Sequence, residues 1–174
     1  MKTTEIIETL RQKLTIPGGR HLYGVLGNYV QLETFAKKIH QAKSPDGQKF
    51  PRSINVNREI LKTIPDDEFK WLAENEAKRP EPTAANVSRA FERFLRSRLT
   101  GKNILVLANM EMLFAYHIEL NLLRTMAADE NRVLLLLPGK RTSGRIIMFH
   151  EMADGNYTLP TNLIAENHLW EIEN

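Results

Sequence analysis

Cysteine is absent from the 174 residues of this chain, which excludes disulfides, cysteine-ligated metal centres and thiol nucleophiles. Long apolar runs are absent too. None exceeds the length of Val133–Leu137, which is far shorter than the roughly 20 residues that a membrane-spanning helix needs. The first fourteen residues carry charges every few positions and no apolar block, unlike a secretory signal. We therefore expect a cytoplasmic protein with no membrane partner.

Recognisable catalytic and metal-binding patterns are missing as well. The five histidines show no paired spacing of the kind that metal ligands adopt. No G-x-S-x-G segment is present, so serine hydrolase chemistry has no candidate nucleophile. The sequence therefore suggests no metal site and no catalytic residue.

Size and composition are those of one globular domain, which we expect to span residues 1–174. Hydrophobic residues make up 42% of the chain and charged residues 26%, close to the averages for folded proteins. Apolar residues at helical spacing predict a short amphipathic helix over 3–14. Further on, apolar strands alternate with helices of ten or more residues. This alternation predicts an α/β fold in three layers, with a mostly parallel sheet between helices.

Turn-forming residues suggest where the elements begin and end. Two prolines within 79–82 predict a hinge-like linker, and Thr83 then caps a helix that ends near Leu99. One helix is expected over 111–127. The segment 138–144, which contains Pro-Gly and a second glycine, is expected to form a turn.

Charge is distributed unevenly. The whole chain carries +3 and has an isoelectric point near 9.2. Residues 146–174 contain five acidic residues and no Lys or Arg, so they carry −5 and the first 145 residues carry +8. A basic excess of this size fits contact with phosphates, but it also fits ordinary solubility.

The turn after the first predicted strand partly fits a phosphate-binding frame. A phosphate loop reads G-x-x-x-x-G-K-[S/T], and Gly27 and Thr34 occupy its first and last positions. Leu32 stands at the second glycine. Glu33 stands at the lysine and reverses the charge that would face a triphosphate. With Asn28 at the turn itself, these residues form at most a degenerate nucleotide site.

A second nucleotide element, an apolar strand that ends in an acidic residue, is also incomplete. In the strand that begins at Ile104, Ala108 stands where an aspartate would hold Mg²⁺. Glu111 remains three residues later. It is either a residual nucleotide-site carboxylate or a charge favoured by the dipole of the following helix.

These segments, in this order, are similar to the BrxF family of BREX phage-defence systems, which are small phosphate-loop proteins. The similarity covers roughly residues 20–172 and rests on four segments: 53–61, 105–114, 117–124 and 134–145. It implies a fold like that of AAA-type ATPases and a place in a multi-protein defence complex. The BrxB family of the same systems also has a strand followed by Pro-Gly, and it is the alternative assignment.

The resemblance suggests a role without nucleotide chemistry, because the matching lysine and aspartate are both missing. We expect a pseudo-ATPase that is a non-catalytic structural or adaptor component, with no cofactor. Its expected partners are other defence proteins, with DNA and further copies of the chain as additional candidates. The alternatives are a stand-alone module that binds nucleic-acid backbones, and a regulatory subunit that binds ATP and Mg²⁺ at Gly27–Thr34.

Two groups of cations are candidates for nucleic-acid or partner binding, or are simply solvated faces. The first group lies on and after the helix that follows Thr83, and the second surrounds the predicted turn at 138–144. The candidates are Arg89, Arg93, Arg96, Arg98, Lys102, Lys140, Arg141 and Arg145. A shared face would favour binding to a phosphate backbone without base recognition.

Overall fold

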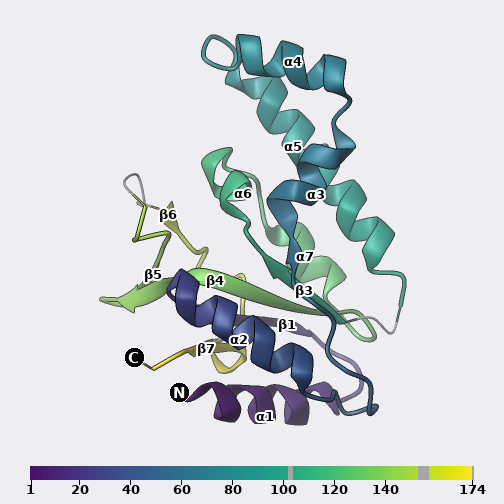
Figure 1. Cartoon of the computed structure of the whole chain (residues 1–174), viewed down its shortest axis with the longest axis vertical. Coiled ribbons are helices and arrows are strands. Elements are labelled where there is room, and N and C mark those ends of the chain that lie inside the picture. The colour runs from purple at the N-terminus through teal and green to yellow at the C-terminus, as the bar shows by residue number, and fades with distance from the viewer. Residues whose placement is uncertain (102–103, 153–156, 174) are drawn as a thin grey trace.

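The computed structural model describes residues 1–101, 104–152 and 157–173, so Lys102 lies outside the described residues. The helices are α1 (Thr3–Leu14), α2 (Tyr29–Gln41), α3 (Val56–Thr63), α4 (Asp66–Asn75), α5 (Pro80–Arg98), α6 (Glu111–Ala115) and α7 (Asn121–Met126), with a 3₁₀ turn at Glu166–His168 (Figure 1). The strands are β1 (Leu22–Gly27), β2 (Ile54–Asn55), β3 (Ile104–Ala108), β4 (Arg132–Thr142), β5 (Arg145–Met148), β6 (Tyr157–Thr158) and β7 (Leu169–Glu171).

The sheet is mostly parallel. Its main path runs β2-β3-β4-β1-β7, and every pairing along that path is parallel. Gly24 of β1 lies between Leu135 of β4 and Leu169 of β7. Beyond the parallel region β4 continues and pairs antiparallel with β5, which in turn pairs with β6. The predicted α/β class with a mostly parallel sheet is therefore confirmed.

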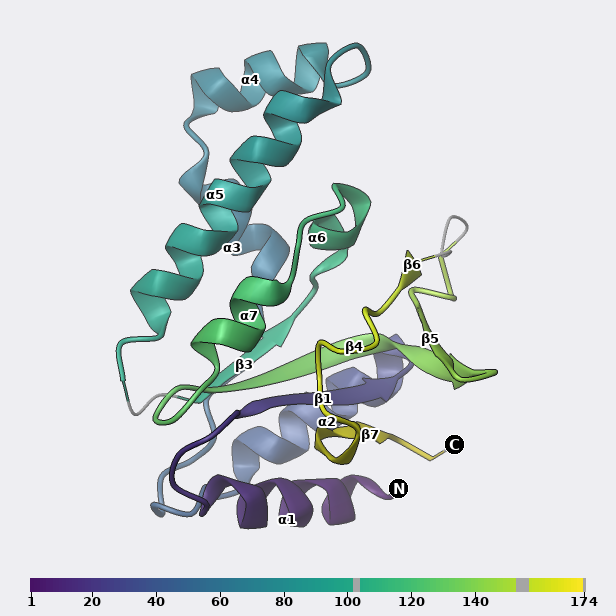
Figure 2. The ribbon, with the colours of Figure 1, turned by 180° about the vertical axis from the view of Figure 1, so that it is seen from behind.

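Helices cover both faces of the sheet. Side chains alternate along β1, so that Tyr23 and Val25 pack with α1 and α2 while Leu22 and Leu26 pack with α3, α5, α6 and α7. Figure 2 shows α1 and α2 together on one side of the sheet and the other helices on the opposite side. Strands buried on both faces need apolar residues throughout, which explains the continuous run in β4.

The residues expected to form a hinge, 79–82, instead begin α5. Pro80 is the first residue of this helix, and Thr83 lies inside it, buried, rather than capping it. Prolines fit the first helical turn because the N–H groups there have no partner within the helix. α5 is the longest helix. Among the described residues, no helix has the length and apolar character required to cross a membrane.

The single helix expected over 111–127 is divided into α6 and α7. His117 has a φ of 52°, in the left-handed region, which ends the helical path. The amide of Ile118 then donates to the carbonyl of Leu113 over 2.7 Å, and this bond closes the end of α6.

The turn expected over 138–144 is shorter than predicted. β4 runs through Pro138 and Gly139 to Thr142, and only Ser143 and Gly144 form the turn to β5. Both turn residues have positive φ, 47° and 77°. A two-residue turn of this kind matches the twist of an antiparallel hairpin. The hairpin formed by β4 and β5 therefore projects beyond the parallel sheet.

Candidate functional site

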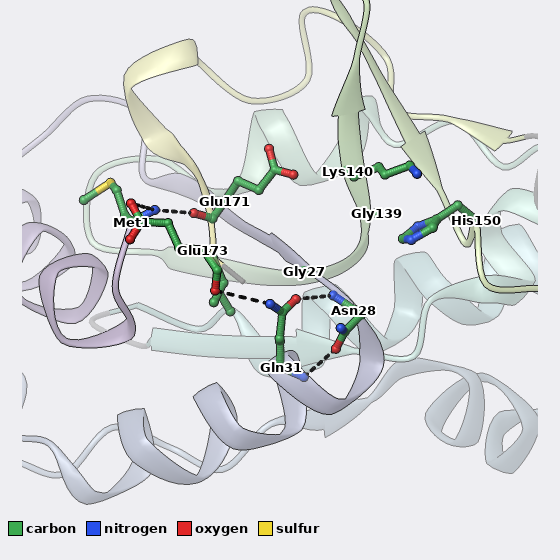
Figure 3. Close-up of a pocket in the computed structure, with 10 residues that line it drawn as sticks. Met1, Gly27, Asn28, Gln31, Gly139, Lys140, His150, Glu171 and Glu173 are labelled. Carbon is green, nitrogen blue, oxygen red and sulfur yellow. Dashed lines mark hydrogen bonds and ion pairs between the residues drawn. The ribbon is translucent and has the colours of Figure 1, made fainter.

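A cavity of about 510 Å³ lies at the carboxyl ends of the parallel strands. Its lining includes Gly27, Asn28, Gln31, Lys140, His150 and Glu171 (Figure 3). Two connections diverge at this edge of the sheet. The connection that follows β1 leads to β2 at one side of the sheet, and the connection that follows β4 leads to β7 at the other side. Such a reversal point is where open α/β sheets bind ligands, so this cavity is the candidate site.

One residue, Asn28, connects β1 to α2. Its side-chain oxygen accepts from the amide of Gln31 over 2.8 Å, and the side-chain oxygen of Gln31 accepts from the amide of Asn28 over 2.8 Å. Figure 3 shows both bonds at the edge of the cavity. This reciprocal pair is a capping box, which satisfies N–H groups that would otherwise be available to an anion.

A carboxylate from another segment meets the same helix end. Glu151, which follows β5, accepts a hydrogen bond of 3.1 Å from the amide of Tyr29, the first residue of α2. The partial positive charge at a helix N-terminus favours a carboxylate at this position. The start of α2 is therefore occupied by the protein's own side chains.

Two of the predicted nucleotide residues point elsewhere. Glu33 accepts a hydrogen bond of 2.7 Å from Lys37 on the exposed side of α2, and this bond lowers the pKa of Glu33. The hydroxyl of Thr34 donates to the carbonyl of Val30 within the same helix. Neither residue lines the main cavity, although Glu33 borders a second, smaller one of about 320 Å³. The structure thus brings Gly27 and Asn28 to the site and leaves Glu33 and Thr34 outside it.

Glu111 is held by hydrogen bonds from two other elements. The hydroxyl of Tyr29 donates to one carboxylate oxygen over 3.0 Å, and the side-chain amide of Asn57 donates to the other over 2.7 Å. Asn57 also accepts a hydrogen bond of 3.1 Å from the amide of Met112. Burial, and next the charge of Glu111, raise the pKa of Tyr29. Glu111 therefore links the starts of α2, α3 and α6.

Tyr29 and Asn57, which hold Glu111, were not identified by the sequence analysis, and none of the three lines the main cavity. Asn57 lies two positions after Asn55, which caps α3. Nothing in this local sequence indicates that Asn57 bonds Glu111, 54 positions away. Only the pairing of β2 with β3 brings the two segments together. Within the described residues, no group of three or more His, Asp or Glu side chains is placed to hold a metal ion.

The predicted cations on α5 are exposed, and most already have a partner on the protein. Arg89 donates to Asn86 over 3.0 Å, and Arg96 pairs with Glu92 over 2.8 Å. Arg98 at the end of the helix lies 3.6 Å from Glu59. Arg93 is exposed and lies along the same helix.

The other predicted cations belong to the β4–β5 hairpin, and both ribbon views show this hairpin away from α5 (Figures 1 and 2). Arg141 pairs with Glu166 over 2.6 Å, Lys140 lines the main cavity, and Arg145 is exposed near the turn. The two groups of cations therefore do not form one shared face.

Comparisons of the chain with models of protein families, with curated proteins and with solved structures find no match. The assignment of a function to this protein therefore depends on the residues and the geometry described above.

Proposed function

We propose that this protein is a non-catalytic structural or adaptor component of a BREX-like anti-phage defence complex, with a fold related to phosphate-loop ATPases of the AAA type. The resemblance of its segments to the BrxF family is the basis of the proposal. The position of β1 supports it. This strand lies inside the parallel sheet, and α2 follows it directly at the carboxyl edge, where such folds bind phosphate.

The observation that carries the non-catalytic part is the connection between β1 and α2. A phosphate loop needs several residues whose amides surround the phosphates, together with a lysine that neutralises charge. Here Asn28 alone makes the connection, and hydrogen bonds to Gln31 and Glu151 occupy the amides of Asn28 and Tyr29. The residues present do not fit ATP and Mg²⁺ at this turn.

The adaptor part is supported by the helical extension formed by α4 and α5, which projects away from the sheet in Figure 1. Leu72 is the buried residue of α4, whereas Phe69 and Trp71 are each 48% exposed. Exposed aromatic side chains supply much of the binding energy at protein interfaces. We infer that this helix contacts another protein of the defence complex.

Calorimetric titration of the purified protein tests the non-catalytic part. We expect no heat of binding and no shift in melting temperature with ATP, ADP or GTP in the presence of Mg²⁺. A dissociation constant in the micromolar range for any of them would contradict the proposal.

Phage challenge tests the adaptor part in a strain whose defence system includes this gene. We expect deletion of the gene to abolish protection and the wild-type gene to restore it. The double variant Phe69→Ala/Trp71→Ala should fail to restore protection. Lys70→Ala, an exposed change on the same helix, should restore it. Full protection after deletion would contradict the proposed role.

A further inference from the structure

Three connections meet at the amino end of the parallel sheet, opposite the candidate site. Figures 1 and 2 both show the α1–β1, α2–β2 and α7–β4 connections gathered at this end. Arg20 forms a β-bridge with Ala128, and the amide of Asp129 donates to the carbonyl of Gly19 over 2.8 Å. In the α2–β2 connection, Lys43 forms a β-bridge with Lys49. We call this surface the amino-end face.

Cations from several segments define the amino-end face. They are Lys13, Arg20, Lys43, Lys49 and Arg132. Arg20, Lys43 and Lys49 are exposed, and none of them forms an ion pair within the part of the chain that the structure describes.

Backbone pairing brings two of these cations together, because the amide of Val133, next to Arg132, donates to the carbonyl of His21, next to Arg20, over 2.9 Å. Charge effects on neighbouring groups agree with this arrangement. Burial is the main cause of the lowered pKa of His168, and Lys13 and Arg20 lower it further. Hydrogen bonds to Ser44 and Gln48 are the main cause of the lowered pKa of Asp46, and Arg132 contributes to it. Charges from four segments thus act over one region. The segments are α1, the connection before β1, the connection after α2, and β4.

Acidic groups on the amino-end face are fewer than its cations, and they are Asp46, Asp129 and Glu130. Asp46 accepts from the hydroxyl of Ser44 and, over 3.1 Å, from the amide of Gln48. Asp129 accepts from the amide of Gly19 over 3.1 Å. These carboxylates stabilise the loops, while the exposed cations beside them remain available to an external anion.

We propose that the amino-end face binds the phosphate backbone of duplex DNA without recognising its sequence. Three of its five cations are lysines, which are depleted at protein–protein interfaces but common at phosphate contacts. Single strands are bound by stacking bases on exposed aromatic rings. In this region His21 and Phe50 are 2% and 0% exposed and His168 is half-buried, so no ring is fully exposed for stacking, which favours a duplex. This inference goes beyond the adaptor role and does not depend on it.

Binding of this kind is weak and strongly dependent on salt. Sequence-independent binding to DNA has a dissociation constant of about 10⁻⁴ to 10⁻⁶ M at physiological salt. Each phosphate contact adds about −0.9 to the slope of log affinity against log salt concentration. Raising salt from 50 to 200 mM should therefore weaken binding about 40-fold for three contacts and about 500-fold for five.

Fluorescence anisotropy with a labelled 20-base-pair duplex tests the proposal on the full chain. The variant Arg20→Ala/Lys43→Ala/Lys49→Ala should bind at least about 10-fold more weakly at 50 mM salt, with a shallower salt slope. The matched control, Lys70→Ala/Lys78→Ala/Arg79→Ala, also removes three exposed cations, which lie on and just after α4. It should bind within about 2-fold of wild type, because these cations lie away from the amino-end face.

Three results would overturn the proposal: equal losses in the two variants, binding that does not respond to salt, or tighter binding of a single strand than of the duplex. The single change Lys49→Glu tests the same proposal, and because Lys49 is exposed in a loop the change carries little risk to folding. It should weaken binding and reduce the salt slope, and unchanged binding would oppose the proposal. Because the assay contains only this protein and DNA, its failure would leave the phage-protection test of the adaptor role unaffected.

Discussion

The hydroxyl of Tyr29 lies 3.0 Å from a carboxylate oxygen of Glu111 and donates a hydrogen bond to it. Tyr29 begins α2 and Glu111 begins α6, so this bond joins two helices that start at the carboxyl ends of β1 and β3. A carboxylate placed here could be taken for a remnant of nucleotide chemistry. Its bonds to Tyr29 and Asn57 give it a structural role instead.

Tyr29→Phe should lower the free energy of unfolding by about 1 kcal/mol, because it removes a hydrogen bond to a charged acceptor at a half-buried position. Urea denaturation measures the change. The matched control is Tyr157→Phe. Tyr157 is also half-buried, and its hydroxyl forms no hydrogen bond within the described residues. It should change stability by less than about 0.5 kcal/mol. Equal effects of the two variants would show that the bond to Glu111 does not stabilise the fold.

Glu33→Lys restores the lysine of the phosphate-loop frame, and we expect it not to create nucleotide binding. Glu33 pairs with Lys37 on the exposed side of α2, away from the main cavity. The variant replaces this pair with two like charges one turn apart, which slightly destabilises the helix. Calorimetry with ATP and Mg²⁺ measures binding, and Glu33→Gln is the control. Micromolar binding by the lysine variant alone would mean that the helix end opens to form a phosphate site.

Stability should decrease as the pH falls below about 6.5, because two histidines are held in the neutral form. Burial lowers the pKa of His21 and of His168, and the charges of Arg132 and Lys13, respectively, lower them further. Since unfolding returns each pKa to its ordinary value near 6.5, the unfolded chain binds more protons below that pH.

Urea denaturation between pH 7.5 and 5.5 measures this dependence. His168→Gln removes one of the two groups and should reduce the slope of unfolding free energy against pH. Stability that stays constant, or that rises as the pH falls through this range, would contradict the prediction.

Gly24→Ala should lower stability by about 1–3 kcal/mol through overpacking of the core. A Cβ atom at this position would lie 2.7 Å from Cδ1 of Leu169 and 2.8 Å from Cδ1 of Ile164. Thermal and urea denaturation measure the loss. Because Ile164→Val removes one of the crowded methyl groups, the double variant should recover part of it. A Gly24→Ala variant as stable as wild type would indicate that β1 and β7 are less tightly packed than the structure shows.

Much of the secondary structure was predictable because it depends on neighbours in the sequence. The spacing of Ile6, Ile7, Leu10 and Leu14 predicts α1, and those residues are the buried side of the observed helix. The apolar run in β4 predicts a strand with two buried faces. Predictions failed where a local signal has two interpretations. The prolines at 80 and 82 suggest a hinge, but proline also fits the first turn of a helix, where the structure places them.

The pattern of residues along the chain is enough to specify the α/β class and to show that the phosphate-loop lysine and the strand-end aspartate are missing. The surroundings of the residues that remain depend on contacts between distant segments. Glu111 meets Tyr29 and Asn57, and Glu151 caps α2, because strand pairing and helix packing bring together segments 54 to 122 positions apart. The grouping of the cations also depends on contacts between distant segments. Local spacing grouped those of α5, whereas the folding of separate loops onto one end of the sheet assembled the amino-end face. Periodicity reports which side of an element is buried, and it carries no information about which distant element that side will meet.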